Sequence, residues 1–128
     1  MKAILDTHIF LWWNMDDPQL SSSIREIISD GRNELFLSAA SAWEIAIKVS
    51  RGRLILPAPP QEYVPDRLVL HGFRPLPISL SHALHVCDLP DHHRDPFDRL
   101  LVAQAQLEDM PILTADSTIA KYDVETVF

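Results

Sequence analysis

Several features that mark membrane, secreted or fibrous proteins are missing from this sequence of 128 residues. It has only three glycines and no low-complexity tract, which excludes collagen-like and repeat architectures. The single cysteine, Cys87, cannot form an internal disulfide, so we expect a reducing compartment. The early apolar run at residues 9–13 is far shorter than the roughly 20 residues of a membrane span. We therefore expect a cytoplasmic protein without a membrane partner.

Positive charge is also scarce. Eleven Lys and Arg stand against 18 Asp and Glu, so the net charge is −7 with neutral histidines. Proteins that bind nucleic acid through a broad electrostatic surface are usually basic, so this class is disfavoured. An enzyme that holds cations over a carboxylate cluster remains compatible with such a chain. The length and the 47% of hydrophobic residues predict a single domain over residues 1–128.

Strand and helix patterns alternate along the chain. Short apolar runs predict strands at residues 2–6, 35–38, 73–79, 112–116 and 124–128. Helical periodicity and capping residues predict helices at residues 7–14, 21–30, 41–51, 62–71, 81–87 and 96–108. Pro75 and Pro77 confine the third strand to a short strand or an edge strand. The alternation predicts an α/β fold, with a mostly parallel sheet of about five strands covered by helices on both faces.

Acidic residues stand where two predicted strands end. Asp6 closes the first strand and Asp116 closes the fourth. Right-handed crossovers bring the carboxyl ends of parallel strands to one rim, where ligands of open α/β sheets bind. We therefore expect these two side chains to meet, although more than a hundred residues separate them.

Three further acids lie at predicted helix starts. Ser41-Ala-Trp-Glu44 has the capping-box pattern, in which the serine caps a helix and the glutamate returns to the backbone. The same position also directs Glu44 at the rim. Asp95, followed by a proline, is typical of an N-cap, whereas Asp98 precedes a buried segment and needs a polar partner or a cavity. Each acid therefore has both a structural and a functional interpretation.

Four acids at one rim would repel one another at pH 7, so at least one of them should have a raised pKa. Such a cluster needs cations, and all-oxygen ligand sets suit Mg²⁺ or Mn²⁺. Metal ions on the attacking and leaving oxygens suit phosphodiester hydrolysis. The histidines do not favour a zinc site, because the adjacent His92 and His93 diverge and the pair His82 and His85 has no third ligand at an obvious spacing.

Four motifs then follow one another along the chain. They are Ile-Leu-Asp-Thr-His-Ile-Phe-Leu-Trp-Trp from residue 4, Ser-Ala-Ala-Ser-Ala-Trp-Glu-Ile-Ala-Ile-Lys from residue 38, His-His-Arg-Asp-Pro-Phe-Asp-Arg-Leu-Leu-Val-Ala-Gln-Ala from residue 92, and Leu-Thr-Ala-Asp from residue 113. In this order they resemble PIN-domain proteins, and most of all VapC-type toxins of prokaryotic toxin–antitoxin modules. The resemblance covers essentially the whole chain and implies a PIN-like three-layer sandwich.

The resemblance implies a Mg²⁺- or Mn²⁺-dependent endoribonuclease, a hydrolase that cleaves RNA phosphodiester bonds. By motif position, its catalytic and metal-binding quartet is Asp6, Glu44, Asp98 and Asp116. Asp98 matches rather than Asp95, because the family's acid immediately precedes the Arg-Leu-Leu-Val-Ala run. Thr114 matches a position whose hydroxyl helps to order water or metal. The basic candidates for RNA contact are Lys48, Arg94, Arg99 and Lys121, although Arg99 is also placed to pair with a helix-start acid.

The resemblance also implies a homodimer and a cognate antitoxin that covers the site. Two alternatives stay open: a catalytically inactive PIN-like binding module and a receiver-like phosphoacceptor signalling domain. A receiver needs a pair of acids after the first strand, an aspartate ending a middle strand and a lysine ending a late one. Here a Thr-His pair follows Asp6, the middle strand ends near Ser38, and Lys121 lies five residues beyond Asp116. The receiver pattern therefore fails in three places.

Overall fold

The computed structural model describes residues 1–128 and contains one five-stranded sheet. Its strands are β1 (Lys2–Leu5), β2 (Glu34–Ser38), β3 (Arg74–Leu76), β4 (Ile112–Leu113) and β5 (Thr126–Val127). They lie in the order β3-β2-β1-β4-β5, and all four neighbouring pairs are parallel. The predicted parallel sheet is confirmed, with the proline-containing β3 at an edge.

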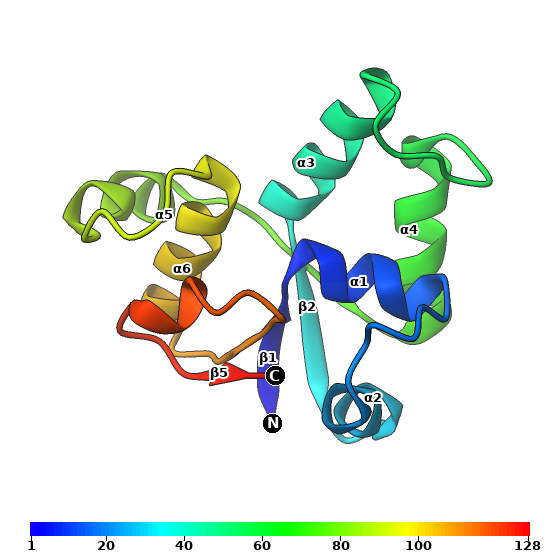
Figure 1. Ribbon diagram of the computed structural model, residues 1–128, viewed down its shortest axis with the longest axis horizontal. Coiled ribbons are helices and arrows are strands. Elements are labelled where there is room, and N and C mark those ends of the chain that lie inside the picture. The colour runs from blue at the N-terminus through cyan, green and yellow to red at the C-terminus, as the bar shows by residue number, and fades with distance from the viewer.

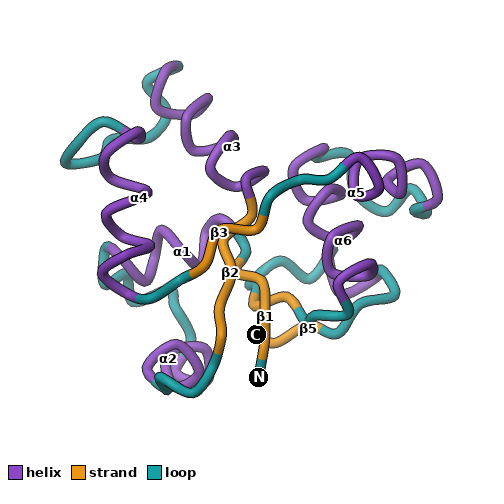
Figure 2. Tube along the Cα trace, turned by 180° about the vertical axis from the view of Figure 1, so that it is seen from behind, coloured by secondary structure: helices purple, strands orange, loops and turns teal.

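Six helices cover the two faces of this sheet. They are α1 (Thr7–Asn14), α2 (Ser22–Ser29), α3 (Ala39–Ser50), α4 (Pro60–His71), α5 (Leu80–His85) and α6 (Pro96–Glu108), with short 3₁₀ turns η1 (Val86–Asp88) and η2 (Ile119–Lys121). Every α-helix begins and ends within two residues of its predicted boundary. Figures 1 and 2 show α1 to α4 on one side of the sheet and α5 and α6 on the other, which confirms the three layers. None of the helices combines the length and apolar character needed to cross a membrane.

The central strands divide their side chains between two hydrophobic cores. In β1, Ala3 and Leu5 belong to the core under α1 to α4, whereas Ile4 belongs to the core under α6. In β4, Leu113 joins the first core and Ile112 the second. Successive side chains of a strand point to opposite faces, so both faces of these strands are apolar when helices cover both. This is why the central strands are continuous apolar runs in the sequence.

One helix start differs from the prediction. The strand β2 passes directly into α3, so this helix begins two residues early and Ser38 is its N-cap, accepting a hydrogen bond from the Ala40 N–H at 3.0 Å. The predicted capping box is therefore wrong. Ser41 instead accepts a hydrogen bond from the Thr7 hydroxyl at 2.8 Å, which ties α3 to the start of α1. Glu44 lies in the second turn and has no capping role.

The last three strands are shorter than predicted: β3 has three residues, and β4 and β5 have two each. The chain leaves the sheet after β4 because it turns at the rim: the Asp116 N–H donates to the Thr114 hydroxyl at 3.0 Å. The residues expected to prolong this strand therefore form the turn that carries one of the predicted site acids.

A buried polar network fixes α6 against the end of β2. Gln104, fully buried on α6, accepts a hydrogen bond from the Ser38 hydroxyl and donates one to the Pro77 carbonyl at 3.2 Å. The amide thus joins β2, the segment after β3 and α6, the helix on which Asp98 lies.

We predict that Gln104→Leu lowers the free energy of unfolding by about 1–3 kcal/mol, because leucine removes the acceptor of the buried Ser38 O–H and the side-chain donor to the Pro77 carbonyl. Urea unfolding followed by circular dichroism measures this change. The control is Gln61→Leu on the exposed side of α4, which should change stability by less than about 0.5 kcal/mol. Equal effects of the two substitutions would contradict the network's role.

Candidate active site

The topology brings the predicted acids to one rim of the sheet. Asp6 directly follows β1, and Asp116 lies three residues after β4. Glu44 lies on α3, which follows β2, and Asp98 lies in the first turn of α6. Figure 1 shows the start of α6 at the same end of the sheet as the starts of α1 and α3. The strand order reverses direction between β1 and β4, which is where open α/β sheets bind their ligands.

Asp6 is held in a buried position by Thr114. The aspartate is 4% exposed, and the fully buried threonine hydroxyl donates to its Oδ2 at 2.7 Å. Burial raises the pKa of the Asp6 carboxyl, while the hydrogen bond from Thr114 opposes this shift. The same hydroxyl accepts from the Asp116 N–H, so Thr114 links the acids that follow β1 and β4.

Glu44 is buried beside a cation from its own helix. Its side chain is 7% exposed, and the Lys48 Nζ lies 3.0 Å from its Oε2, one helical turn further on. The ion pair offsets the negative charge of a carboxylate that has left water. Lys48, one of the predicted RNA contacts, therefore lies at the acid cluster.

Asp95 and Asp98 have different places at the start of α6. The Asp95 carboxylate accepts from the Phe97 N–H at 2.9 Å and from the Asp98 N–H at 3.4 Å, which confirms it as the N-cap. The Asp98 side chain is 14% exposed and faces the cluster. Burial, together with the charges of four neighbouring acids, raises the pKa of Asp98 to about 8; these neighbours are Asp6, Asp95, Glu44 and Asp116. This agrees with the raised pKa expected for at least one acid of the cluster.

The Asp116 carboxylate accepts hydrogen bonds from two donors. Partial burial acts to raise the pKa of its carboxyl, but the Thr118 N–H at 2.9 Å and the His93 ring lower the pKa overall. The acids of the cluster thus differ in their environments. Asp98 disfavours a negative charge in the metal-free protein, whereas Asp116 accommodates one.

His93 lies inside the cluster, which the sequence did not indicate. Its Nε2 lies 3.0 Å from Oδ2 of Asp116, to which it donates, and 3.0 Å from Oδ2 of Asp98. Its Nδ1 accepts a hydrogen bond from the Asp95 N–H at 3.1 Å, so the proton of a neutral ring belongs on Nε2. His93 therefore acts as an N–H donor between two carboxylates. As expected, His92 diverges; it packs against the Tyr122 ring.

The remaining predicted RNA contacts are not brought to the acids. Arg99 does not pair with an acid: its guanidinium donates to the carbonyls of Val86 at 3.2 Å and Pro90 at 2.9 Å. It holds the loop that precedes α6, and the predicted acid pair is wrong. Arg94 and Lys121 are exposed, and their side chains form no hydrogen bond or ion pair and line neither hollow beside the acids.

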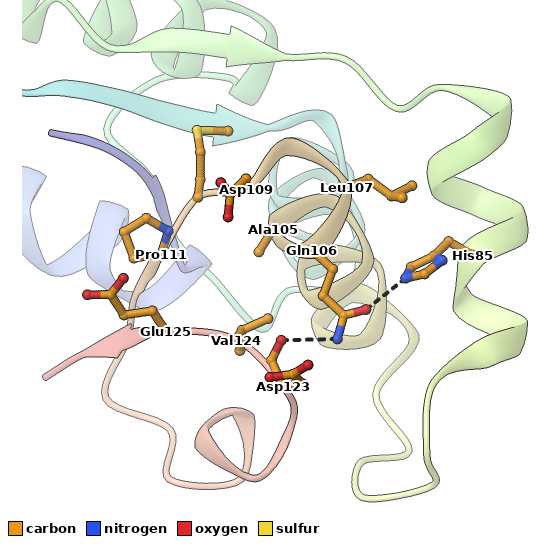
Figure 3. A pocket seen from close by; sticks show the side chains of 10 residues that line it. His85, Ala105, Gln106, Leu107, Asp109, Pro111, Asp123, Val124 and Glu125 are labelled. Atoms are coloured by element: carbon orange, nitrogen blue, oxygen red, sulfur yellow. Dashed lines mark hydrogen bonds between the residues drawn. The ribbon is translucent and has the colours of Figure 1, made fainter.

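Two hollows open beside the acids. One, of about 350 Å³, is lined by Asp6, His8, Trp12, Ala115 and Asp116. The other, of about 270 Å³, is lined by Glu44, Ile47, Lys48, Arg51, Arg53, Asp95, Pro96 and Phe97. A larger cavity, of about 490 Å³, lies at the opposite end of α6, beside the residues that precede β4 and β5 (Figure 3). There Gln106 bridges His85 and the Asp123 carbonyl, and none of the predicted site residues takes part.

The chain also resembles known proteins in sequence. The model of the PIN domain family matches residues 3–125. Ribonuclease VapC16 of Mycobacterium tuberculosis is 49% identical over 61 residues, which are 48% of this chain and 43% of that protein. Ribonuclease VapC22 of the same organism is 28% identical over 121 residues, or 94% of this chain and 91% of that protein. The chain thus matches less than half of the first relative and nearly all of the second.

Solved structures share the fold at low sequence identity. VapBC2 from Rickettsia felis, bound to a DNA fragment from their promoter, has a TM-score of 0.72 at 14% identity and covers 99% of this chain and 98% of that chain. FitAcB from Neisseria gonorrhoeae has a TM-score of 0.66 at 21% identity, and the match covers 100% of this chain and 97% of that chain. At these identities the likeness establishes the fold.

We predict that Asp98→Asn stabilises the metal-free protein increasingly as the pH rises. The folded pKa of about 8 exceeds the value of about 3.9 for an unfolded aspartate. The protonated Asp98 therefore contributes fully to the stability of the wild type below pH 4, and this stability is lost progressively up to about pH 8. At pH 8 the variant should be more stable by at least about 1 kcal/mol, or about 3 °C in Tm. Thermal melts in EDTA between pH 4 and 8 measure the difference.

The matched control for this experiment is Asp95→Asn. Asparagine also caps helices well, so this variant should keep most of the wild-type pH dependence. If Asp98→Asn melts at or below the wild-type temperature throughout the range, the acids do not repel one another in the folded chain.

His93 should support metal binding by orienting Asp116 and Asp98. We predict that His93→Ala weakens Mn²⁺ binding about 10- to 100-fold, the usual cost of removing a partner that orients metal ligands. His93→Gln keeps an N–H donor and should retain most of the affinity. Isothermal titration with Mn²⁺ measures both. An equal loss in the two variants would identify the imidazole itself as a ligand, and no loss in either would leave His93 without this role.

Proposed function

The chain belongs to the PIN domain family, and on this premise we propose that its acid cluster hydrolyses RNA phosphodiester bonds. The resemblance noted in the sequence is confirmed, as is the α/β fold. The observation that carries the proposal is the convergence of acids from four separate elements on one rim; they are Asp6, Glu44, Asp98 and Asp116. Both relatives compared above are named ribonucleases, which supports RNA as the substrate.

The donor set fits a divalent cation. Two of the four carboxyls have raised pKa values, and the ligand atoms of all four acids are carboxylate oxygens, which hard cations prefer. The His93 ring nitrogen lies within 4.8 Å of carboxylate oxygens of Asp98 and Asp116, so it is a further candidate ligand. We propose that Asp6 and Asp98 hold the principal Mg²⁺ or Mn²⁺, with Glu44 and Asp116 completing the site. When bound, the ion supplies a water of lowered pKa and offsets charge on the scissile phosphate.

The other residues of the site orient these acids. Thr114 holds the Asp6 carboxylate through a 2.7 Å hydrogen bond, and His93 holds Asp116 at 3.0 Å. The Lys48 ammonium, 3.0 Å from Glu44, is the cation closest to the acids and is placed to meet a phosphate oxygen. In the reaction a water oxygen bonds to phosphorus, one ester P–O bond breaks, and the leaving oxygen takes up the proton that the water loses. Carboxylates held in fixed positions favour the in-line geometry of this attack.

We also propose that the protein is the toxin of a type II toxin–antitoxin pair, forms a homodimer and is covered by a cognate antitoxin. The structural neighbours support this partner: one is VapBC2 and another is described as a toxin–antitoxin complex from Klebsiella pneumoniae. A small upstream gene that encodes a DNA-binding protein would be the expected genetic companion.

The alternative functions are less consistent with the structure. The strand order β3-β2-β1-β4-β5 differs from the 2-1-3-4-5 order of receiver domains, which argues against a phosphoacceptor. An inactive module would have no need to hold four acids against their repulsion. The buried Asp6 and the raised pKa of Asp98 therefore favour a catalytic site.

We predict that Asp6→Asn, Asp98→Asn and Asp116→Asn each reduce metal-dependent RNA cleavage at least about 100-fold. Each substitution removes the negative charge of a metal ligand but keeps the shape of the side chain. The chain is expressed alone in a bacterium, and the 5′ ends of cleaved RNA are sequenced. Native circular dichroism spectra exclude unfolding as the cause. Full activity in Asp98→Asn with loss in Asp95→Asn would show that the wrong acid of the α6 start was assigned.

The metal has a readout that needs no RNA. Mn²⁺ at a hundredfold excess over its dissociation constant should stabilise the wild type by about 2.7 kcal/mol, and should do much less for Asp6→Asn. A wild-type Tm that does not change in millimolar Mn²⁺ would refute the metal site, even for a member of this family.

A further inference from the structure

The hollow beside Glu44 has the composition of a nucleic-acid strand site. We propose that an unpaired stretch of RNA lies in it, with a base stacked on Trp43 and the neighbouring phosphates bound by Lys48, Arg51 and Arg53. The inference rests on the proposed ribonuclease activity and deepens it, because it names the residues that bind the RNA beside the acids.

The first argument is charge. Three of the eleven basic residues of this acidic chain line one hollow of about 270 Å³; they are Lys48, Arg51 and Arg53. The side chains of Arg51 and Arg53 are exposed and form no ion pair or hydrogen bond. By contrast, Arg25 and Arg32 each pair with an aspartate at about 3 Å. Unpaired cations beside a carboxylate site can bind the phosphates that flank the reacting one.

The backbone brings Arg53 back to this hollow. Gly52 has a positive φ of 69°, which turns the chain at the end of α3. The Arg53 N–H then donates to the Lys48 carbonyl at 2.9 Å. A cation at a helix C-terminus is stabilised by the helix dipole, which explains Lys48 and Arg51 without a ligand. It does not explain Arg53, which lies beyond the helix and is turned back toward the same hollow.

The second argument is an exposed aromatic side chain. Trp43 is 59% exposed, and its ring meets that of Phe97 edge-to-face, with centroids 5.2 Å apart. Trp43 precedes Glu44 and Phe97 precedes Asp98, so the aromatic pair spans the two helices that carry site acids. Phe97 also lines the basic hollow. A tryptophan that is fixed by packing and lies next to cations is the usual platform for single-stranded nucleic acid, because any unpaired base can stack on it.

The second hollow beside the acids extends the proposed path of the RNA strand. It lies on the side of Asp6 and Asp116 and carries His8 and Trp12, whose rings are 5.8 Å apart. A strand that enters by the basic hollow and leaves by this one places a phosphate over the acids between them. The groove and the proposed chemistry therefore use the same rim.

The test measures binding separately from cleavage. In the Asp6→Asn background, a fluorescent single-stranded RNA of about 12 nucleotides and mixed sequence is titrated by anisotropy at several salt concentrations with Mn²⁺ present. Arg51→Gln and Arg53→Gln should each weaken binding and reduce the slope of log K against log salt by about 0.7. Trp43→Ala should weaken binding about 5- to 100-fold with the slope unchanged, and Trp43→Phe should weaken it less.

Two controls make the result specific. Arg32→Gln removes an exposed arginine that precedes β2 at the opposite rim, and should change neither affinity nor slope. Trp43→Ala should leave the affinity for a duplex of the same sequence unchanged. Full single-strand affinity in Trp43→Ala, or equal effects of Arg32→Gln and Arg51→Gln, would overturn the groove. So would a change of mass in light scattering on Trp43→Ala, because Trp43 would then belong to a protein interface.

Failure of the groove and failure of the activity are distinguishable. If the Asp6-containing wild type cleaves RNA with Mn²⁺ while the Trp43 and arginine variants bind normally, the groove is wrong and the nuclease stands. If the wild type cleaves no RNA while these variants lose binding as described, the groove stands without the proposed chemistry.

Discussion

The parallel pairing of β1 with β2 on one side and β4 on the other is the constraint on which the site depends. Because the three strands run in one direction, the turn after β1, the helix after β2 and the turn after β4 all begin at one rim. The two faces of the sheet belong to different layers, with α3 on one and α6 on the other. The N-terminal halves of these two helices meet across the rim, where Trp43 packs against Phe97.

This convergence concentrates negative charge in a place with little water. The rest of the site moderates the repulsion without removing it. Lys48 pairs with Glu44, the Thr114 hydroxyl donates to Asp6, and the His93 ring donates to Asp116. Asp98 receives the least compensation, and its pKa is the one raised to about 8. A divalent cation would complete the balance, which is why the electrostatics and the proposed chemistry point to the same rim.

Support for the site comes from a loop without regular structure. Arg99 donates to the carbonyls of Val86 and Pro90 and fixes the segment that leads to α6. The same segment carries His93, whose ring orientation is set by the Asp95 N–H. Asp95 in turn caps α6, so one residue both starts the helix and orients the histidine. The acid on α6 is therefore positioned by a chain of contacts that begins outside the sheet.

The sequence by itself determined the layers, all helices to within two residues, the parallel sheet and the rim on which the acids gather, because apolar periodicity and capping act over neighbouring residues. Motif order predicted Asp98 rather than Asp95 as the site acid, and in the structure Asp95 is the N-cap of α6. Only the tertiary structure decided that Ser38 rather than Ser41 caps α3, that His93 joins the acids, and that Arg99 holds a loop instead of an acid. The tertiary structure likewise shows that Arg51 and Arg53 line the hollow beside Glu44, because the chain turns at Gly52. These contacts join segments that are distant in sequence or depend on a turn, and no local pattern encodes which distant group lies within hydrogen-bonding range.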